Sequence, residues 1–404
     1  MARGDGPLGG MKVIDMTHVM AGPTCALMLA DMGADVIKVE KVPGGDDSRR
    51  SVPPKIGDEA ASFLVMNRNK RSIAVDLKTD GGKDVVRRLA GDADAILENY
   101  RQGTMAKLGL AFEDLRKDNP KLVWCSISGF GQTGPYADRG GFDLVAQGMS
   151  GLMHITGEGP GRPPCKVGAP ITDITAGILA AMGVSAAYAH AIKTGQGQLV
   201  DTSLFEAGIT HTYWQSAITF ATGHSPAAMG SAHPLNAPYQ AFETSDGWIT
   251  CGAANQRTWE RLLEALENPG LGDDPRFKEN TGRMANLPEL VDILAPIFKA
   301  RTSAEWLALF DQVGLPAGLV MDITQMHADP HAIARGMIID VPHKTLGSTK
   351  AVGMPVKFSE TKVKTDQGAP VYGEHTREVL AEHGYSADEI DGLIAAGAVI
   401  AAEA

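Results

Sequence analysis

Short apolar runs alternate with helix-forming stretches over roughly the first 130 residues of the chain. The apolar runs are typical of buried strands, and the stretches between them have the apolar spacing of helices. This alternation predicts βαβ units, so we expect an α/β fold with a doubly wound, Rossmann-like parallel sheet. The strands are expected at 11–16, 35–40, 71–77, 93–98 and 121–128.

The segment THVMAGP at 17–23 lies between the first expected strand and its helix. In an open parallel sheet, ligands bind where strands end and helices begin. No dinucleotide fingerprint opens the helix after this strand, and the chain has no G-x-x-x-x-G-K-[ST], so a nucleotide cofactor is not expected. Judged alone, the basic segment NRNKR at 67–71 is expected to be a solvated turn.

A glycine- and proline-rich stretch at 140–169 gives way to an alanine-rich apolar run that begins at Pro170. Proline is favoured at the first helical position, so we expect a helix that starts at Pro170 and carries Asp173 in its first turn. The partial positive charge of a helix N-terminus stabilises a carboxylate there. On local sequence alone, Asp173 is better explained as an ordinary first-turn acid than as a catalytic group.

The composition changes near residue 225 to small and polar residues. Two short runs, at 239–243 and 248–252, flank a Ser-Asp-Gly turn and predict a hairpin. Together with three helical stretches, the hairpin predicts a small α+β domain over 225–330. The helical stretches are expected at 258–266, 287–300 and 303–313.

Charge and cysteine usage limit the partners and the location. Asp and Glu number 48 against 37 Lys and Arg, for a net charge of −11, which argues against nucleic-acid and anionic-membrane binding. We expect no transmembrane helix, because no apolar run is expected to reach ~18 residues. The 4 cysteines are widely spaced, which favours a reducing, cytoplasmic location and no metal site.

Segments along nearly the whole chain resemble the class III CoA-transferases, whose type members are formyl-CoA and carnitine CoA-transferases. Each motif is weak singly, but the set is specific in this order and spacing. The matching segments are VIDMTHVMAGP (13–23), MGADVIKVEK (32–41), NRNKRSIAVDLKT (67–79), ILENYRQG (96–103), SISGFGQTGPY (126–136), GFDLVAQGMSG (141–151), GAPITDITAG (168–177), GLPAGLV (314–320), HADPH (327–331) and GEHT (373–376).

The resemblance implies a domain organisation and an assembly. It implies a large doubly wound domain built from both chain ends, 1–224 and 331–404, with the small α+β domain 225–330 inserted between them. It also implies an interlocked homodimer, in which each chain passes through a ring formed by the other. Threading of this kind is nearly absent from protein folds, so residue patterns alone would not predict it.

The resemblance also implies a reaction. Asp173 matches the position of the family's nucleophile, which would move CoA from an acyl-CoA donor to an organic acid through an aspartyl mixed anhydride and an aspartyl-CoA thioester. Such covalent catalysis divides one difficult transfer into easier steps. Backbone N–H groups of a glycine-rich loop would stabilise each oxyanion. Acyl-CoA and a carboxylic acid are therefore the expected ligands, without metal.

Contacts to coenzyme A are carried over by position. His18, Val19 and Ala21 match the contacts on the adenine and pantetheine side, and Leu77, Asn99 and Tyr100 match the wall of the CoA channel. Lys41 and Lys107 stand where the family often has arginines near the phosphates, and lysine keeps the charge but loses the bidentate geometry. Arg71, in the basic segment, is expected to supply further charge.

Two departures from the family bear on the reaction. The sister α-methylacyl-CoA racemases have Gly-His-Asp where this chain has Gly141-Phe142-Asp143, and a phenylalanine cannot carry a proton, which favours transfer. The small domain has MGSAHPLNAPYQ (229–240) in place of a glycine run, so His233, Asn236 and Tyr239 are candidates for acceptor contacts or for simple loop packing. The alternatives are a racemase or epimerase of the same fold and a non-catalytic CoA-binding protein.

Overall fold

The computed structural model describes residues 5–363 and 365–402. The chain divides into two compact units, which are described separately. The sheet unit comprises Met1–Ser150, Val167–His211 and Pro330–Ala404, and the hairpin unit comprises Gly151–Lys166 and Thr212–Asp329. The predicted large domain included residues 151–166 and 212–224, which this division places in the hairpin unit. The predicted domain boundaries stay a prediction.

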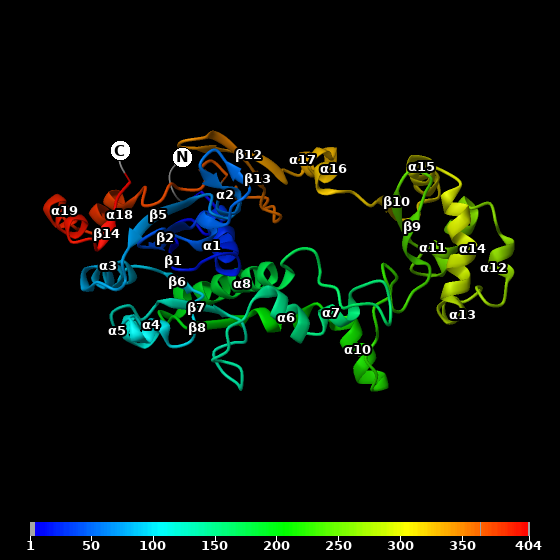
Figure 1. Cartoon of the computed structure of the whole chain (residues 1–404), viewed down its shortest axis with the longest axis horizontal. Helices are drawn as coiled ribbons and strands as arrows, with labels where there is room; N and C mark the ends of the chain where they lie inside the picture. The colour runs from blue at the N-terminus through cyan, green and yellow to red at the C-terminus, as the bar shows by residue number, and fades with distance from the viewer. Residues whose placement is uncertain (1–4, 364, 403–404) are drawn as a thin grey trace. The chain divides into compact units, whose positions relative to one another are not determined.

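The sheet unit is organised around a mixed sheet in which parallel strands predominate (Figure 1). Among the described residues its order is β14-β5-β2-β1-β6-β7-β8, and only β14, at one edge, runs antiparallel to its neighbour. The chain therefore starts in the middle of the sheet and winds outward in both directions, which confirms the α/β class. The strands are β1 (Lys12–Asp15), β2 (Asp35–Lys41), β5 (Lys70–Val75), β6 (Ala95–Glu98), β7 (Val123–Ser128), β8 (Leu199–Ser203) and β14 (Val399–Ile400).

Helices cover both faces of this sheet because its strands alternate buried side chains between two cores. On one face α1 (Ala21–Asp31), α8 (Ile171–Thr194) and α9 (Leu204–Thr210) pack with Val13, Val36 and Leu97. On the other face α3 (Asp80–Ala90), α4 (Thr104–Lys107), α5 (Phe112–Asp118), α18 (Thr376–Glu382) and α19 (Ala387–Ala395) pack with Ile14, Ile37 and Ile96. The segment after residue 373 thus returns to the strands near the start of the chain.

The helix α8 passes close to the start of α1. A Cβ atom on Gly177 would lie 2.5 Å from the carbonyl oxygen of Ala21 and 2.6 Å from the Cβ of Thr24, so only glycine permits this approach. By length and composition α8 could cross a membrane, contrary to the expectation that no run is long enough. Its small residues, Ala176, Ala180 and Val184 among them, are buried in the core beside α1, as in the core helix of a globular unit.

The hairpin unit contains the predicted hairpin. Strands β9 (Tyr239–Glu243) and β10 (Trp248–Gly252) pair antiparallel, and β11 (Ala317–Leu319) adds a third strand on β10. The three predicted helices are confirmed as α11 (Gln256–Ala265), α14 (Leu287–Lys299) and α15 (Ser303–Val313). The ring of Phe298 stacks on that of Phe242 with 4.2 Å between centroids, which fixes α14 against the hairpin.

Several elements of the structure differ from the predicted ones. The sequence predicts a single helix at 203–222, but the structure has α9 followed by α10 (Tyr213–Thr222), and a hairpin of β12 (Ile338–His343) and β13 (Gly347–Val352) was not predicted. Pro170 is the N-cap of α8 and not its first residue. The remaining elements are η1 (Asp47–Arg50), β3 (Lys55–Ile56), β4 (Glu59–Ala60), α2 (Ala61–Met66), α6 (Asp143–Met149), α7 (Leu152–Ile155), α12 (Gly270–Asp273), α13 (Asn280–Ala285), α16 (Ile323–Ala328) and α17 (Pro330–Ala334).

Candidate active site

Asp173 lies in the first turn of α8, as predicted, and its side chain is partly buried. Its neighbour Asp143, at the start of α6, accepts hydrogen bonds from the Thr172 backbone N–H at 2.9 Å and from the Thr172 hydroxyl at 2.8 Å. The buried Gln147 donates to the second Asp143 oxygen at 2.8 Å and accepts from the Val167 N–H at 2.9 Å. These bonds hold the segment before α8 against α6 and so fix the position of Asp173.

The ionisation of Asp173 differs from the expectation based on the helix terminus. Burial, and secondarily the negative charge of Asp143, raise the pKa of Asp173 to about 6. Desolvation therefore outweighs the stabilisation that a helix N-terminus gives to a carboxylate. With that pKa, about nine-tenths of the Asp173 side chains are still ionised at pH 7.

The close approach of α8 to α1 brings Asp173 toward the loop that follows β1. Residues four apart lie on one face of a helix, so Asp173 shares the face on which Gly177 meets Ala21 and Thr24. Ala21 opens α1 directly after the loop 17–20. Asp173 is therefore placed beside the carboxyl end of β1, where ligands of open parallel sheets bind.

The loop after β1 is held by side chains from neighbouring strands. Asn99 accepts from the His18 N–H and donates to the His18 carbonyl, both at 2.9 Å, and His18 Nε2 lies 3.0 Å from the Tyr100 hydroxyl. Burial, followed by the charge of Lys38, lowers the pKa of His18. Its buried Nδ1 has no hydrogen-bond partner among the described residues, which leaves one polar atom available at this edge.

The edge formed by the carboxyl ends of the strands brings together most of the predicted CoA contacts. The side chain of Lys41, at the end of β2, is 40% exposed and pairs with Asp47 at 2.6 Å. Leu77 follows β5 and is half-buried beside the same core as Tyr100. Lys107 is exposed at the end of α4. The residues at this edge are His18, Val19, Ala21, Lys41, Leu77, Asn99 and Tyr100.

Arg71 does not join this group. It lies four residues before the end of β5, about 13 Å along the strand at ~3.3 Å per residue. Its side chain is 3% exposed and pairs with Asp35 at 2.6 Å and with Glu382 at 2.7 Å. The guanidinium is thus engaged at the opposite end of the sheet, away from the predicted phosphate contacts.

The basic segment that contains Arg71 is not the solvated turn expected from its composition. All five side chains of Asn67–Arg71 are buried. Arg68 pairs with the buried Asp31 at 2.5 Å, and Lys70 pairs with the buried Asp15 at 3.0 Å. The segment is therefore a buried ionic connection between α1, β1 and β5.

The candidate acceptor contacts lie together within the hairpin unit. The imidazole of His233 stacks on the Tyr239 ring at 5.2 Å, and Trp214, which sequence reasoning missed, meets His233 edge-on at 6.1 Å. His233 Nδ1 accepts from the Leu235 N–H at 3.1 Å, and the amide of Asn236 is best oriented to donate to the carbonyls of Ala254 and Leu235. The three predicted residues thus form one aromatic and amide cluster.

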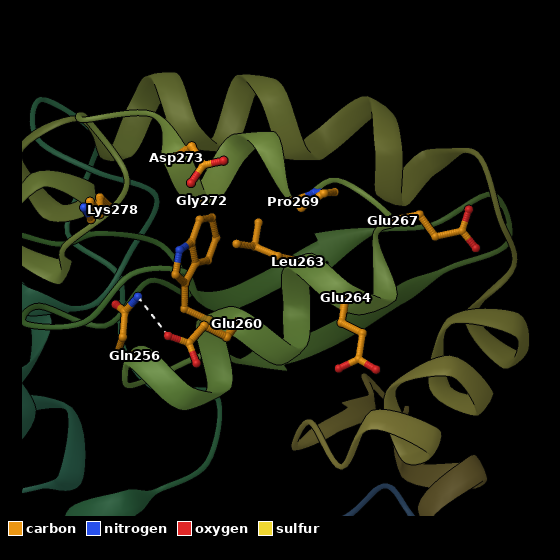
Figure 2. Close-up of a pocket in the computed structure, with 10 residues that line it drawn as sticks. Gln256, Glu260, Leu263, Glu264, Glu267, Pro269, Gly272, Asp273 and Lys278 are labelled. Carbon is orange, nitrogen blue, oxygen red and sulfur yellow. Dashed lines mark hydrogen bonds between the residues drawn. The ribbon is translucent and has the colours of Figure 1, made fainter.

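A cavity of about 600 Å³ in the hairpin unit contains none of the predicted site residues (Figure 2). It lies between α11 and the segment after it, with Glu260, Glu264, Glu267 and Asp273 on its wall. Among the described residues, no group of three or more His, Cys, Asp or Glu side chains could hold a metal ion. The run GFGQTG at 129–134 has dinucleotide-motif spacing, but no helix starts there, so it lacks the helix N-terminus that binds a pyrophosphate.

Comparisons with known proteins show the family of the chain. A family model described as CoA-transferase family III matches residues 8–376. The chain is 37% identical over 395 residues to the succinyl-CoA:glutarate CoA-transferase of Mus musculus, covering 97% of this chain and 90% of that protein. It is 40% identical over 382 residues to the succinate–glutarate CoA-transferase of Agrobacterium fabrum, covering 93% and 95%. A crystal structure of a CAIB/BAIF family protein from Brucella suis matches with a TM-score of 0.84 and 38% identity, covering 94% of this chain and all of that one. This chain therefore belongs to CoA-transferase family III.

Proposed function

We propose that this CoA-transferase uses Asp173 as a covalent nucleophile to move CoA from an acyl-CoA donor to a carboxylic acid. The observation that carries the proposal is the position of Asp173, which is fixed in the first turn of α8 one turn before the contact with α1. There a partly desolvated carboxylate stands beside the loop expected to bind CoA. Partial desolvation also makes the carboxylate a better nucleophile than it would be in water.

The reaction proceeds in four steps, in which the CoA thiolate leaves and returns twice. The Asp173 carboxylate attacks the donor thioester carbonyl, which forms a mixed anhydride and releases the CoA thiolate. The thiolate attacks the anhydride at the aspartyl carbonyl, which gives aspartyl-CoA and the donor acid. The acceptor carboxylate attacks the aspartyl thioester and releases the thiolate again, which then takes the acceptor acyl group and frees Asp173. No proton need be transferred, so an unassisted carboxylate suffices.

The proposed ligand contacts follow from the same edge of the sheet. His18, Val19, Ala21, Leu77, Asn99 and Tyr100 would line the CoA site, and Lys41 and Lys107 would meet its phosphates. Because relatives are named for succinyl-CoA and glutarate, this donor and acceptor are the first pair to assay. His233, Asn236 and Tyr239 remain the proposed acceptor contacts, and replacement of His233 would then raise the KM for the acid alone.

Trapping of the covalent intermediate tests this proposal. The protein is incubated with succinyl-CoA, quenched with hydroxylamine or borohydride, and mapped by mass spectrometry. Modification of the peptide that contains Asp173, absent in Asp173→Asn, is the expected result. Modification of a different residue would refute the mechanism. So would the absence of any modified residue in a protein that catalyses CoA transfer. Exchange of the substrate α-proton with D2O, without need of an acceptor acid, would indicate the racemase instead.

The pH dependence of the reaction follows from the raised pKa of Asp173. Only the ionised carboxylate attacks, and its pKa of about 6 lies above the ordinary range. We therefore expect kcat/KM to be level above about pH 7 and to fall tenfold per pH unit below about pH 6. Asp143→Asn removes the smaller cause of the shift, so its acid limb should move partly toward lower pH. An acid limb centred below pH 5 in the unaltered protein would contradict this assignment.

A homodimer is proposed, and exposed apolar side chains of the sheet unit support it. Ile178 and Met182 on α8 are 43% and 64% exposed, and Leu144 on α6 is 54% exposed. Residues 178 and 182 stand one turn apart, so they form a continuous apolar stripe of the kind that marks protein interfaces. Interlocking would make the pairing resistant to dilution. We further propose a cytoplasmic location, in keeping with four cysteines that are all free.

A charge on that stripe should disrupt the assembly. For Met182→Glu we expect fewer chains to assemble into dimers during expression, seen as a monomer fraction in sedimentation equilibrium or light scattering, whereas the unaltered protein should show twice the chain mass at all concentrations. Lys193→Glu, at the far end of the same helix, controls for the charge itself. A monomeric unaltered protein would overturn the proposed assembly.

A further inference from the structure

The loop after β1 contains a residue in a costly backbone conformation. Val19 has φ = 68°, in the left-handed region. Among the described non-glycine residues with such a φ, namely Val19, Asn69 and Glu267, it alone is β-branched. A β-branched residue is a rare outlier there, and such strain persists only where its surroundings enforce it. Val19 is 49% exposed, so burial of this residue does not offset the strain.

A buried carboxylate holds the strained residue. Asp46 Oδ1 accepts from the Val19 N–H at 3.1 Å, while it also accepts from the Ser48 N–H and hydroxyl, both at 2.8 Å. The side chain of Asp46 is 0% exposed. Its backbone N–H donates to Glu40 at 3.0 Å, and Glu40 is itself paired with Arg49 at 2.7 Å. Asp46 is thus fixed at both its main chain and its side chain.

A buried lysine in the middle of β2 completes the arrangement. Lys38 Nζ lies 2.8 Å from Asp46 Oδ2, 3.7 Å from Asp15 Oδ2 and 3.0 Å from the Thr17 carbonyl, to which it donates. Apart from this ion pair, Asp46 Oδ2 has no partner among the described residues. The charge of Lys38 also keeps the pKa of Asp46 well below its ordinary value. Lys38 therefore keeps Asp46 ionised and holds the loop on the other side of Val19.

We propose that Asp46 and Lys38 are positioning residues that hold Val19 in its left-handed conformation and so preorganise the loop 17–20 for coenzyme A. The inference rests on the proposed function, because the loop must be part of the CoA site. The backbone of this loop is already hydrogen-bonded by side chains. Asp15 accepts from the Thr17 N–H, and Lys38 donates to the Thr17 carbonyl. Asn99 bonds both backbone groups of His18, and Asp46 accepts from the Val19 N–H. A loop fixed before the ligand arrives loses less conformational freedom on binding.

A double-mutant cycle with glycine at position 19 tests this role. Asp46→Ala should weaken CoA binding about tenfold, the change that 1.4 kcal/mol would produce. It should raise KM for acyl-CoA by the same factor with little change in kcat, because Asp173 is untouched. Glycine adopts a positive φ without a steric penalty. In a Val19→Gly background, Asp46→Ala should therefore weaken CoA binding by at most about threefold. The dissociation constant for free CoA is measured by calorimetry on folded protein.

Two further variants separate positioning from general stability. Asp31→Asn disturbs an equally buried ion pair in the same unit that does not touch the loop, and it should lower the melting temperature without changing CoA affinity. Asp46→Asn keeps an oxygen that can accept from the Val19 N–H, so it should lose less CoA affinity than Asp46→Ala. If the alanine variant does not fold, the asparagine variant takes its place in the double-mutant cycle.

The outcomes are distinct. Failure of the unaltered protein to bind CoA would overturn the proposed function. If the unaltered protein binds CoA, an Asp46 variant that binds as tightly would overturn the positioning role alone. The positioning role would also be overturned if replacement of Asp46 reduced CoA affinity equally in the Val19→Gly background and in the protein with valine at position 19.

Discussion

Replacement of Asp173 by asparagine or alanine is expected to lower the rate of CoA transfer by about 10⁴-fold or more, the scale seen when a covalent nucleophile is removed. Neither side chain can form the anhydride, and no second carboxylate replaces it, because Asp143 is engaged in holding the start of α8. Initial rates are measured with succinyl-CoA and glutarate, and CoA binding is measured in parallel. The binding should change little, which would place the loss in the chemical steps.

A matched control uses another acid at the start of a helix. Asp80 opens α3, and its side chain is 96% exposed, so Asp80→Asn removes an ordinary first-turn acid and should leave the rate unchanged. If Asp173→Asn behaved like Asp80→Asn, Asp173 would be an ordinary first-turn acid and the covalent mechanism would be abandoned.

The second large effect concerns stability. Arg68→Ala should lower the free energy of unfolding by about 3–5 kcal/mol, the usual result of breaking a buried ion pair. The side chains of Arg68 and Asp31 are 2% and 1% exposed, and among the described residues the variant leaves the buried Asp31 carboxylate with only the Asn69 amide, 2.8 Å away, as a hydrogen-bond donor. Denaturant unfolding followed by circular dichroism measures the change.

An exposed pair provides the comparison for that measurement. Arg377 and Asp391 lie 2.7 Å apart with more than half of each side chain exposed, so Arg377→Ala should hardly move the unfolding midpoint. Equal effects of the two arginine variants would show that the basic segment is not the buried ionic connection described here.

The sequence predicts the parallel strands well because each is an apolar run with a clear boundary. The hairpin at 239–252 was predicted for the same reason, since a Ser-Asp-Gly turn separates its two strands. The break between α9 and α10 was missed because no glycine or proline marks the junction, which reads Thr210-His211-Thr212. Pro170 was placed one position too far into its helix, since proline is compatible with both the cap and the first turn.

The predicted site depended more on family likeness than on local pattern. Asp173 has no local feature that separates it from other first-turn acids; its raised pKa arises from burial and from Asp143, thirty residues earlier in the chain. Arg71 was assigned to the ligand because a run of basic residues is usually solvated, whereas here each charged side chain is itself buried and paired with a carboxylate. One signal was available: Lys38 interrupts the apolar run DVIKVE, and a cation inside a buried strand requires a counter-charge nearby.

The edge of the sheet next to β5 is closed by β14, whose Val399 pairs with Val75. Until the intervening several hundred residues have left the ribosome, β5 has no neighbour on that side and presents open backbone donors and acceptors. Such an edge invites pairing with other nascent chains. Shortening the chain from its C-terminal side, so that β14 is lost, should therefore produce aggregates and not a smaller active enzyme.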